Sequence, residues 1–315
     1  MNVIVTGSIA YDYLMTFPGR FAECILPDQL HCISLSFLVD EMRRQRGGCA
    51  ANIAYNLALL GERPRLMGTV GQDFGEYRAW LEAHGVDTSL TREEPDLFTA
   101  SFFVNTDLDG NQIASFYTGA MARARDLSLR GLQADLVTIS PNDPQAMVRY
   151  AAECRELGLP YLYDPSQQII RLSADDLRAG LEGCALLVVN EYEFNLIQER
   201  TGLEAEAIRA APAWACVVTC GAEGSRIWAE GRMYEIPIVP PGRVADPTGV
   251  GDAYRAGLIK GLALGVGWDL AGRMGALAAT YALEQVGPQS HTYTPAGFVA
   301  RFREHFDDGG MLDKM

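Results

Sequence analysis

The residues most able to do chemistry lie in one short segment that combines two glycines with a carboxylate. Residues 246–252 read Asp-Pro-Thr-Gly-Val-Gly-Asp, and a run with helical spacing follows directly. Gly249 and Gly251 would let an anion approach the backbone, and the first turn of a helix presents N–H groups without a partner in the helix. Asp252 in that turn could accept a proton from an alcohol. An ordinary capped helix start is the alternative interpretation.

A second glycine pair, Gly47-Gly48, precedes another segment of helical spacing. Asn52, about one turn into that segment, offers both a hydrogen-bond donor and an acceptor to a polar ligand. Two glycines before a helix are common, so this pair alone indicates little.

Two further loops follow runs that we expect to be strands. Residues 219–224 read Thr-Cys-Gly-Ala-Glu-Gly, a glycine loop where doubly wound sheets bind ligands, and the chain has no Walker A motif. Asn190 and Glu193 could hold water around Mg²⁺, or they could simply cap a helix. Together the four loops favour phosphoryl transfer from Mg-ATP to a hydroxyl group.

The elements that must position these loops alternate between short β-branched runs and longer helical stretches. This alternation predicts an α/β fold, a doubly wound and mainly parallel sheet flanked by helices on both faces. Strands are expected at residues 3–6, 64–70, 136–139, 161–163, 186–189 and 216–219, and helices at 50–60, 77–84 and 144–157. A region rich in Ala, Gly and Leu follows residue 252, where Gly257 and Gly261 permit close helix packing.

Two stretches interrupt the alternation. Residues 11–46 contain an apolar run of β type at 31–39, and residues 98–117 contain two β-type runs, 100–105 and 112–117, joined by a connector with an Asp-Gly pair. We expect a small antiparallel sheet acting as a lid, formed by about residues 12–46 and 99–118 and inserted in a single domain of residues 1–315. An extension of the main sheet is the alternative topology.

Composition excludes several classes of function. The 315 residues include 26 Lys and Arg against 40 Asp and Glu, a formal net charge of -14, with no basic run. A nucleic-acid partner is therefore not expected, nor is a membrane partner, because no apolar stretch approaches the ~20 residues of a spanning helix. The first residues predict a strand rather than a signal peptide, and the seven cysteines form no C-x-x-C. We expect a cytoplasmic protein with reduced, mostly buried thiols.

The four loops resemble the motifs of the ribokinase-like, or PfkB, carbohydrate and nucleoside kinases. Residues 246–252 are similar to the signature D-T-x-G-x-G-D, with Pro247 standing between the first Asp and the Thr. Residues 47–52 match the family's G-G-x-x-x-N, residues 190–193 its N-x-x-E and residues 219–224 its T-x-G-x-x-G, in the family's order. The resemblance covers nearly the whole chain and implies a ribokinase-like fold.

Within the family, further segments look like the bacterial, mycobacterial-type adenosine kinases. These segments are residues 5–12, 17–21, 34–40, 113–117 and 164–168. The resemblance implies ATP-dependent phosphorylation of the 5′-hydroxyl of adenosine, giving AMP and ADP. A PfkB-type sugar kinase acting on ribose or fructose and a broad-specificity nucleoside kinase are the alternatives. A binding protein that has lost catalysis is disfavoured by the intact Asp252 and both glycines.

The resemblance also implies roles for individual residues. Asp252 is expected to be the general base, with the amides of Gly249, Val250, Gly251 and Asp252 stabilising the γ-phosphoryl group. Phe102 and Phe116 are expected to sandwich the purine, although they could be ordinary core aromatics of a small sheet. The residues expected to bind the nucleoside are Ser8, Asp12, Ser36, Gly48, Asn52, Phe102, Phe116, Gln167 and Gln168.

The remaining expectations concern ATP, metal ions and assembly. The residues expected at the ATP site are Asn190, Thr219, Gly221, Gly224 and Thr248, with Glu193 and Asn190 positioning Mg²⁺ through water. A requirement for a monovalent cation such as K⁺ is a further implication of the resemblance. Because the apolar run at 35–39 would form a sticky edge, we expect the lids of two chains to pair in a homodimer.

Overall fold

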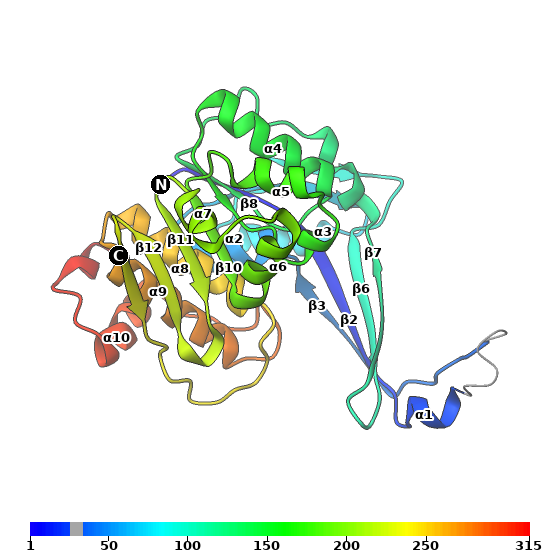
Figure 1. Ribbon diagram of the computed structural model, residues 1–315. Helices are drawn as coiled ribbons and strands as arrows, with labels where there is room; N and C mark the ends of the chain where they lie inside the picture. Colours follow the sequence, from blue (N-terminus) through cyan, green and yellow to red (C-terminus); the bar gives the residue numbers. More distant parts are fainter. Residues whose placement is uncertain (26–33) are drawn as a thin grey trace.

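The expected parallel strands form the centre of one nine-stranded sheet (Figure 1). The computed structural model describes residues 1–25 and 34–315. The order of the strands is β13-β12-β11-β10-β9-β8-β1-β4-β5; strands β11 to β5 in this order are parallel, and β12 and β13 add an antiparallel hairpin at one edge. The bounds are β1 Val3–Thr6, β4 Arg65–Gly71, β5 Thr91–Glu94, β8 Leu136–Ile139, β9 Tyr161–Tyr163, β10 Leu186–Asn190, β11 Ala215–Thr219, β12 Ser225–Ala229 and β13 Arg232–Ile236.

Helices cover both faces of this sheet, as the alternation predicts. Neighbouring residues of a strand belong to different apolar clusters: Val188 packs with helices α2, α8, α9 and α10, whereas Val189 packs with α4, α5, α6 and α7. The bounds are α2 Cys49–Leu59, α3 Gly75–Ala83, α4 Pro144–Leu157, α5 Ala174–Leu181, α6 Glu191–Thr201, α7 Ala205–Ala210, α8 Val250–Leu264, α9 Trp268–Leu283 and α10 Pro295–His305; the short 3-10 helices are η2 Gly119–Asp126, η3 Ser166–Ile170, η4 Gly221–Glu223 and η5 Met311–Lys314.

Helix α8 lies close against α9, which fixes the helix that carries Asp252. A Cβ atom on Gly257 would lie 2.7 Å from the Cα of Gly275, and one on Gly261 would lie 2.6 Å from the Cα of Ala271. These glycines therefore allow the backbones to touch, as the sequence indicates.

The chain reverses its direction across the sheet at β1. Strands β4 and β5 follow on one side of β1, and β8 to β11 follow on the other. Ligands of doubly wound sheets bind outside the carboxyl ends of the strands at such a reversal. Ser8 lies there, and its N–H donates to the carbonyl of Pro141 after β8 at 2.7 Å.

A small second sheet projects from the body (Figure 1). It has the order β3-β2-β6-β7, with bounds β2 Ala10–Thr16, β3 Glu41–Gly47, β6 Ala100–Thr106 and β7 Gln112–Tyr117. The expected β6–β7 hairpin is present; its connector is held by the Asp107 carboxylate, which accepts hydrogen bonds from the N–H groups of Asp109 and Asn111. The sheet is mixed rather than antiparallel, because β2 and β6 run parallel.

The prediction of a strand at residues 31–39 is wrong for residues 34–39, the part of this run that the structure describes. Residues 31–33 lie outside the described residues, and residues 34–39 have no regular secondary structure. Phe37 packs instead against Phe17 and against Phe21 of the short helix α1, Phe21–Cys24. The antiparallel partner of β2 is β3, a charged edge strand whose exposed arginines gave no apolar signal.

Two further expectations concern thiols and membranes. The six cysteines among the described residues are all free, and Cys154, Cys184, Cys216 and Cys220 are buried. Within residues 1–25 and 34–315, no helix has the length and apolar character needed to cross a membrane.

Candidate active site

Asp252 lies in the first turn of α8, with its carboxylate buried against α2. The side-chain amide of Asn52 donates from Nδ2 to Asp252 Oδ2 at 2.9 Å. Burial raises the pKa of Asp252 to about 6, although Arg255 and Asn52 act to lower it. The carboxylate is therefore ionised at neutral pH and still basic enough to accept a proton.

The two glycines before Asp252 serve different purposes. Gly249 has a φ of +79°, and a Cβ atom there would lie 2.5 Å from Pro288, so only glycine fits. A Cβ atom on Gly251 would lie 2.7 Å from Nη1 of Arg255. Gly251 therefore leaves room for a guanidinium group, and the free N–H groups of the first turn remain open to an anion.

Arg255 and Asp164 form a buried ion pair beside Asp252. Arg255 Nη2 donates to Asp164 Oδ1 at 2.6 Å and to the carbonyl of Val188 at 3.3 Å. Burial raises the pKa of Asp164 to about 7 against the opposing effect of Arg255. Sequence reasoning gave neither residue a role. The available signal was an arginine three residues after Asp252 in a segment rich in Ala, Gly and Leu.

The glycine pair at the start of α2 lies against β2. A Cβ atom on Gly47 would lie 2.5 Å from Oδ2 of Asp12, and Gly48, with a φ of +92°, lies against the backbone of Ser8. Ser8 Oγ accepts a hydrogen bond from the N–H of Cys49 at 3.0 Å. Burial and the nearby carboxylate of Asp246 raise the pKa of Asp12 to about 6.

Asp12 belongs to a row of side chains on one face of the small sheet. Strand register places Gln45, Asp12, Phe102 and Phe116 side by side on β3, β2, β6 and β7. Phe116 is 48% exposed, so this residue is not an ordinary core aromatic. Gln45 lies beside Gly287, and sequence reasoning missed it because β3 was not expected.

Asn190 and Glu193 form a helix cap, which is the alternative interpretation given above. Asn190 Oδ1 accepts from the N–H of Glu193 at 2.8 Å, and Glu193 Oε2 accepts from the N–H of Asn190 at 2.9 Å. Ser166 Oγ donates to Glu193 Oε1 at 2.9 Å. The charge of Glu193 nevertheless raises the pKa values of both Asp164 and Asp252, so this cap lies near the candidate base.

Of the other residues expected at the ATP site, Thr219, Gly221 and Gly224 lie at and just after the end of β11, and Thr248 lies in the loop before α8. Thr219 pairs with Asn190 across β10 and β11. Gly221 and Gly224, in the turn that follows, both have positive φ, at +56° and +89°. Thr248 is exposed, and its N–H donates to Asp246 Oδ1 at 2.9 Å just before α8.

Of the other three residues expected to bind the nucleoside, Gln167 and Gln168 lie in η3, which packs against α6, and Ser36 lies apart from them. Ser36 is exposed beside Phe37, beyond the far end of β2. Gln167 is exposed and lies next to Ser166, whose Oγ donates to Glu193. Gln168 is buried in η3, and its Oε1 has no hydrogen-bond partner in the described chain.

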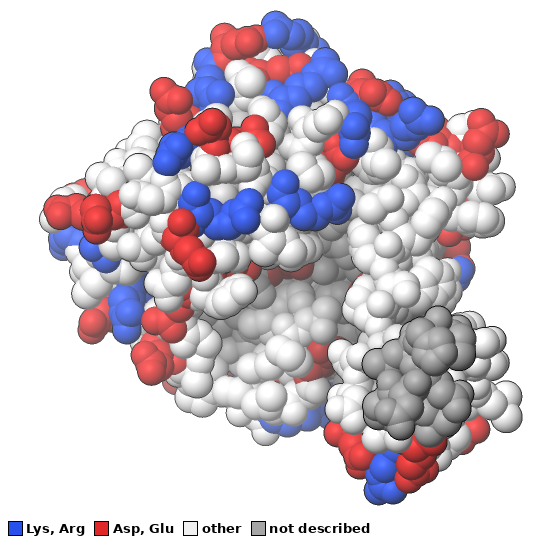
Figure 2. All heavy atoms as spheres, turned by 45° about the vertical axis from the view of Figure 1, so that its right-hand side comes forward, with Lys and Arg blue, Asp and Glu red and all other residues white. Residues whose placement is uncertain are grey.

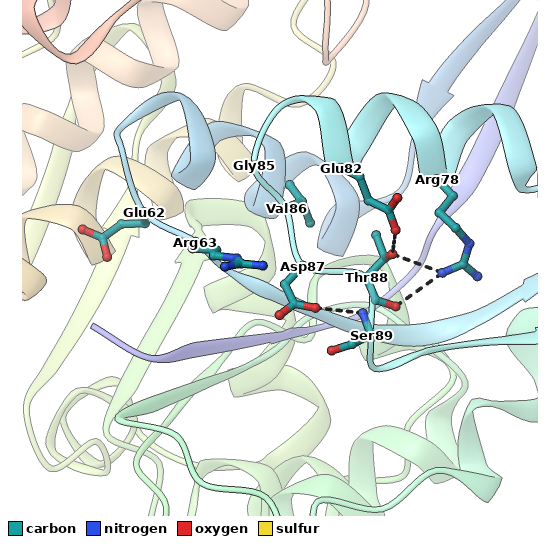
Figure 3. A pocket seen from close by; sticks show the side chains of 9 residues that line it. All are labelled: Glu62, Arg63, Arg78, Glu82, Gly85, Val86, Asp87, Thr88 and Ser89. Carbon is teal, nitrogen blue, oxygen red and sulfur yellow. Dashed lines mark hydrogen bonds between the residues drawn. The ribbon is translucent and has the colours of Figure 1, made fainter.

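Figure 2 shows the face of the molecule hollowed between the body and the projecting sheet, with acidic side chains on the floor of the hollow. A separate pocket of about 650 Å³ is lined by residues 62–63, 78, 82 and 85–89 (Figure 3). Its loops precede β4 and β5, so it lies at the opposite end of the parallel sheet from Asp252.

The fold and the site together define a kinase of the ribokinase-like architecture. The model of the pfkB family of carbohydrate kinases matches residues 19–295, and the chain belongs to this family. The nucleoside kinase of Methanothermobacter thermautotrophicus is 30% identical over 306 residues, covering 96% of this chain and 95% of the relative.

Solved structures agree with this assignment. The Burkholderia thailandensis nucleoside kinase in complex with inosine is 37% identical with a TM-score of 0.87, covering 96% of this chain and 98% of that chain. The same enzyme in complex with ADP-inosine is 40% identical with a TM-score of 0.84, covering 96% of each chain. These relatives carry the name nucleoside kinase, a broader class than the adenosine kinases that the sequence resembles.

Proposed function

We propose that this kinase transfers the γ-phosphoryl group of ATP to the 5′-hydroxyl of purine nucleosides, adenosine among them, giving AMP and ADP from adenosine. The observation that carries the proposal is the position of Phe102 and Phe116 in one row with Asp12, the candidate ribose-binding residue, on one face of the small sheet. The relatives solved with inosine and with ADP-inosine support the same substrate class.

Asp252 serves as the general base in this proposal. Its carboxylate takes the proton of the 5′-hydroxyl while the hydroxyl oxygen bonds to the γ-phosphorus and the bond to the ADP oxygen breaks. The amides of residues 249–252 at the start of α8 stabilise the charge on the transferred group. A base with a pKa of about 6 is ionised before the reaction and protonated only briefly.

The acidic surroundings fit a nucleotide that arrives with Mg²⁺. Asp164, Glu193 and Asp252 surround a single buried cation, Arg255, so a further positive charge is favourable there. In this proposal Asn190 and Glu193 would hold the ion through water and phosphate. Magnesium would neutralise phosphate charge, and a potassium requirement remains part of the test below.

The nucleoside is recognised by stacking and by hydroxyl contacts. Phe102 and Phe116 offer apolar faces worth about 1–3 kcal/mol per base, and Asp12 can accept hydrogen bonds from two ribose hydroxyls. Gln168 has a buried, unpartnered Oε1, and its amide can pair with the edge of adenine or of hypoxanthine. Closure of the small sheet as a lid would bring these groups together.

Pairing of two lids is the second part of the proposal. Leu38 is 83% exposed and Met42 is 61% exposed at the outer part of the small sheet, and Ile113 is 42% exposed. Exposed apolar side chains on the lid favour a homodimer. Light scattering of the wild type and of a Leu38→Glu, Met42→Glu variant tests it; a wild type that is a monomer at micromolar concentration overturns the pairing.

The proposed activity is tested by ADP release from Mg-ATP with adenosine, inosine, guanosine, ribose and fructose, each with and without K⁺. We expect turnover with the purine nucleosides and little with the free sugars. The Asp252→Asn variant is the matched control for contaminating kinases. A preference for ribose or fructose would contradict the nucleoside assignment and leave a sugar kinase of the same family.

A further inference from the structure

Gln289 lies in the loop between α9 and α10, close against the residue that holds Asp252. Its side chain is 6% exposed. Nε2 of Gln289 donates to Asn52 Oδ1 at 3.0 Å and also to the hydroxyl of Tyr77. The Tyr77 hydroxyl in turn donates to the carbonyl of Gly47 at 2.9 Å. A chain of hydrogen bonds thus runs from the backbone of β3 to the candidate base.

The donor and the acceptor of every hydrogen bond in this series follow from the carbonyl of Gly47, where the series begins. A carbonyl oxygen can only accept, so the Tyr77 hydroxyl donates to Gly47 and must accept from Gln289. Gln289 therefore presents Nε2, not Oε1, to both Tyr77 and Asn52. Asn52 must then accept through Oδ1, which leaves Nδ2 to donate to Asp252. A reversed Asn52 amide would place an oxygen against the Asp252 carboxylate.

The loop that carries Gln289 is fixed on both sides. Before it, the N–H of Gly287 donates to Asp246 Oδ2 at 3.0 Å. After it, the carbonyl of His291 accepts from the Tyr55 hydroxyl at 2.7 Å, and His291 Nε2 pairs with Asn56 Oδ1 at 2.8 Å. Gln289 is therefore held at a defined place over α2.

We propose that Gln289 is a positioning residue of this kinase: by donating to Asn52 Oδ1 it holds the Asn52 amide in the one orientation that donates to Asp252. The inference rests on the proposed role of Asp252 as the general base. It adds a residue whose side chain reaches Asp252 through Asn52.

The experiment compares the pH dependence of kcat in the wild type, Gln289→Glu, Gln289→Met and Tyr77→Phe. An ionised glutamate has no N–H to donate, so Asn52 turns its Nδ2 toward it and Asp252 loses its donor. Loss of a hydrogen bond to a charged group predicts that the acid limb moves up by about one pH unit, so that kcat falls by about 2-fold at pH 7 and by about 10-fold at pH 5. Gln289→Met should move the limb in the same direction, and Tyr77→Phe should do so less.

The matched control is Gln285→Glu, the same substitution four residues earlier in the same loop, where the side chain contacts Arg243 instead of Asn52. We expect the acid limb of this control to stay at the wild-type position. Variants that only lose Tm or active fraction, with an unmoved acid limb, would overturn the positioning role. A wild type without activity on any acceptor would instead overturn the proposed function.

Discussion

The Nδ2 atom of Asn52 lies 2.9 Å from Oδ2 of Asp252, although 200 positions separate the two residues in the chain. The contact joins the first turns of α2 and α8, each of which follows a glycine with a positive φ. Both helix starts therefore point at one spot, where unpaired amides, an oriented side-chain amide and a buried carboxylate meet.

Replacing Asp252 with Asn should remove the proton acceptor without disturbing its surroundings, because the new amide oxygen can still accept from Asn52. We expect kcat to fall by about 10²-fold or more. Isothermal titration calorimetry should show nearly unchanged nucleoside binding. Near-normal turnover would remove Asp252 from the role of base.

The same substitution should stabilise the folded chain at neutral pH. Burial raises the pKa of Asp252 from 3.8 to about 6, so the folded state holds this proton more tightly than the unfolded state. The resulting loss in the free energy of unfolding is absent below about pH 4 and develops between pH 4 and 6. Above pH 6 it is complete and corresponds to about 3 kcal/mol. Urea unfolding should show a higher free energy of unfolding for Asp252→Asn than for the wild type at pH 7 but not at pH 4. An equal increase at both pH values would contradict this account.

The pH dependence of kcat should report the surroundings of Asp252. We expect activity to fall as pH drops through about 6, because the base becomes protonated. Replacing Arg255 with Met removes the cation that lowers this pKa, so the acid limb should move to higher pH. The variant should also lose about 3–5 kcal/mol of stability, since Asp164 is left buried without its partner. An unmoved limb in a folded variant would show that Arg255 does not act on the base.

Much of the body could be predicted from the sequence. Strands β1, β8 and β9 match the expected residues, because buried parallel strands are short β-branched runs between helices. Asn190 lies at the carboxyl end of β10, as the sequence predicts, whereas Asn52 and Asp252 are brought together by α2 and α8, which follow β3 of the small sheet and the antiparallel strand β13.

The remainder depends on contacts that no local pattern reveals. Strand β3 is an exposed edge strand that contains Arg43, Arg44 and Arg46, so it lacks the apolar alternation that identifies strands. Asp164 and Arg255 are 91 positions apart, and Asn52 and Gln289 are 237 apart. Each of these side chains reads as an ordinary polar residue until the fold brings its partner to it.

Adjacent phenylalanines on β6 provide a test of purine recognition with an internal control. Phe102 shares the face of Asp12 and Phe116, whereas Phe103 points to the opposite face and stacks on Tyr13 with ring centroids 4.7 Å apart. Phe102→Ala should raise the KM for adenosine by about 10- to 100-fold, as expected for a lost stacking contact of about 1–3 kcal/mol.

Phe103→Ala removes the same ring from the other face of the same strand, so it should leave that KM close to the wild-type value while lowering Tm. Turnover of ribose, measured at high concentration, should be no more sensitive to Phe102→Ala than to Phe103→Ala, because a free sugar has no base to stack. Equal effects of the two substitutions on adenosine would mean that this face of the small sheet contributes only to folding, and the purine site would then have to be sought elsewhere along the hollow.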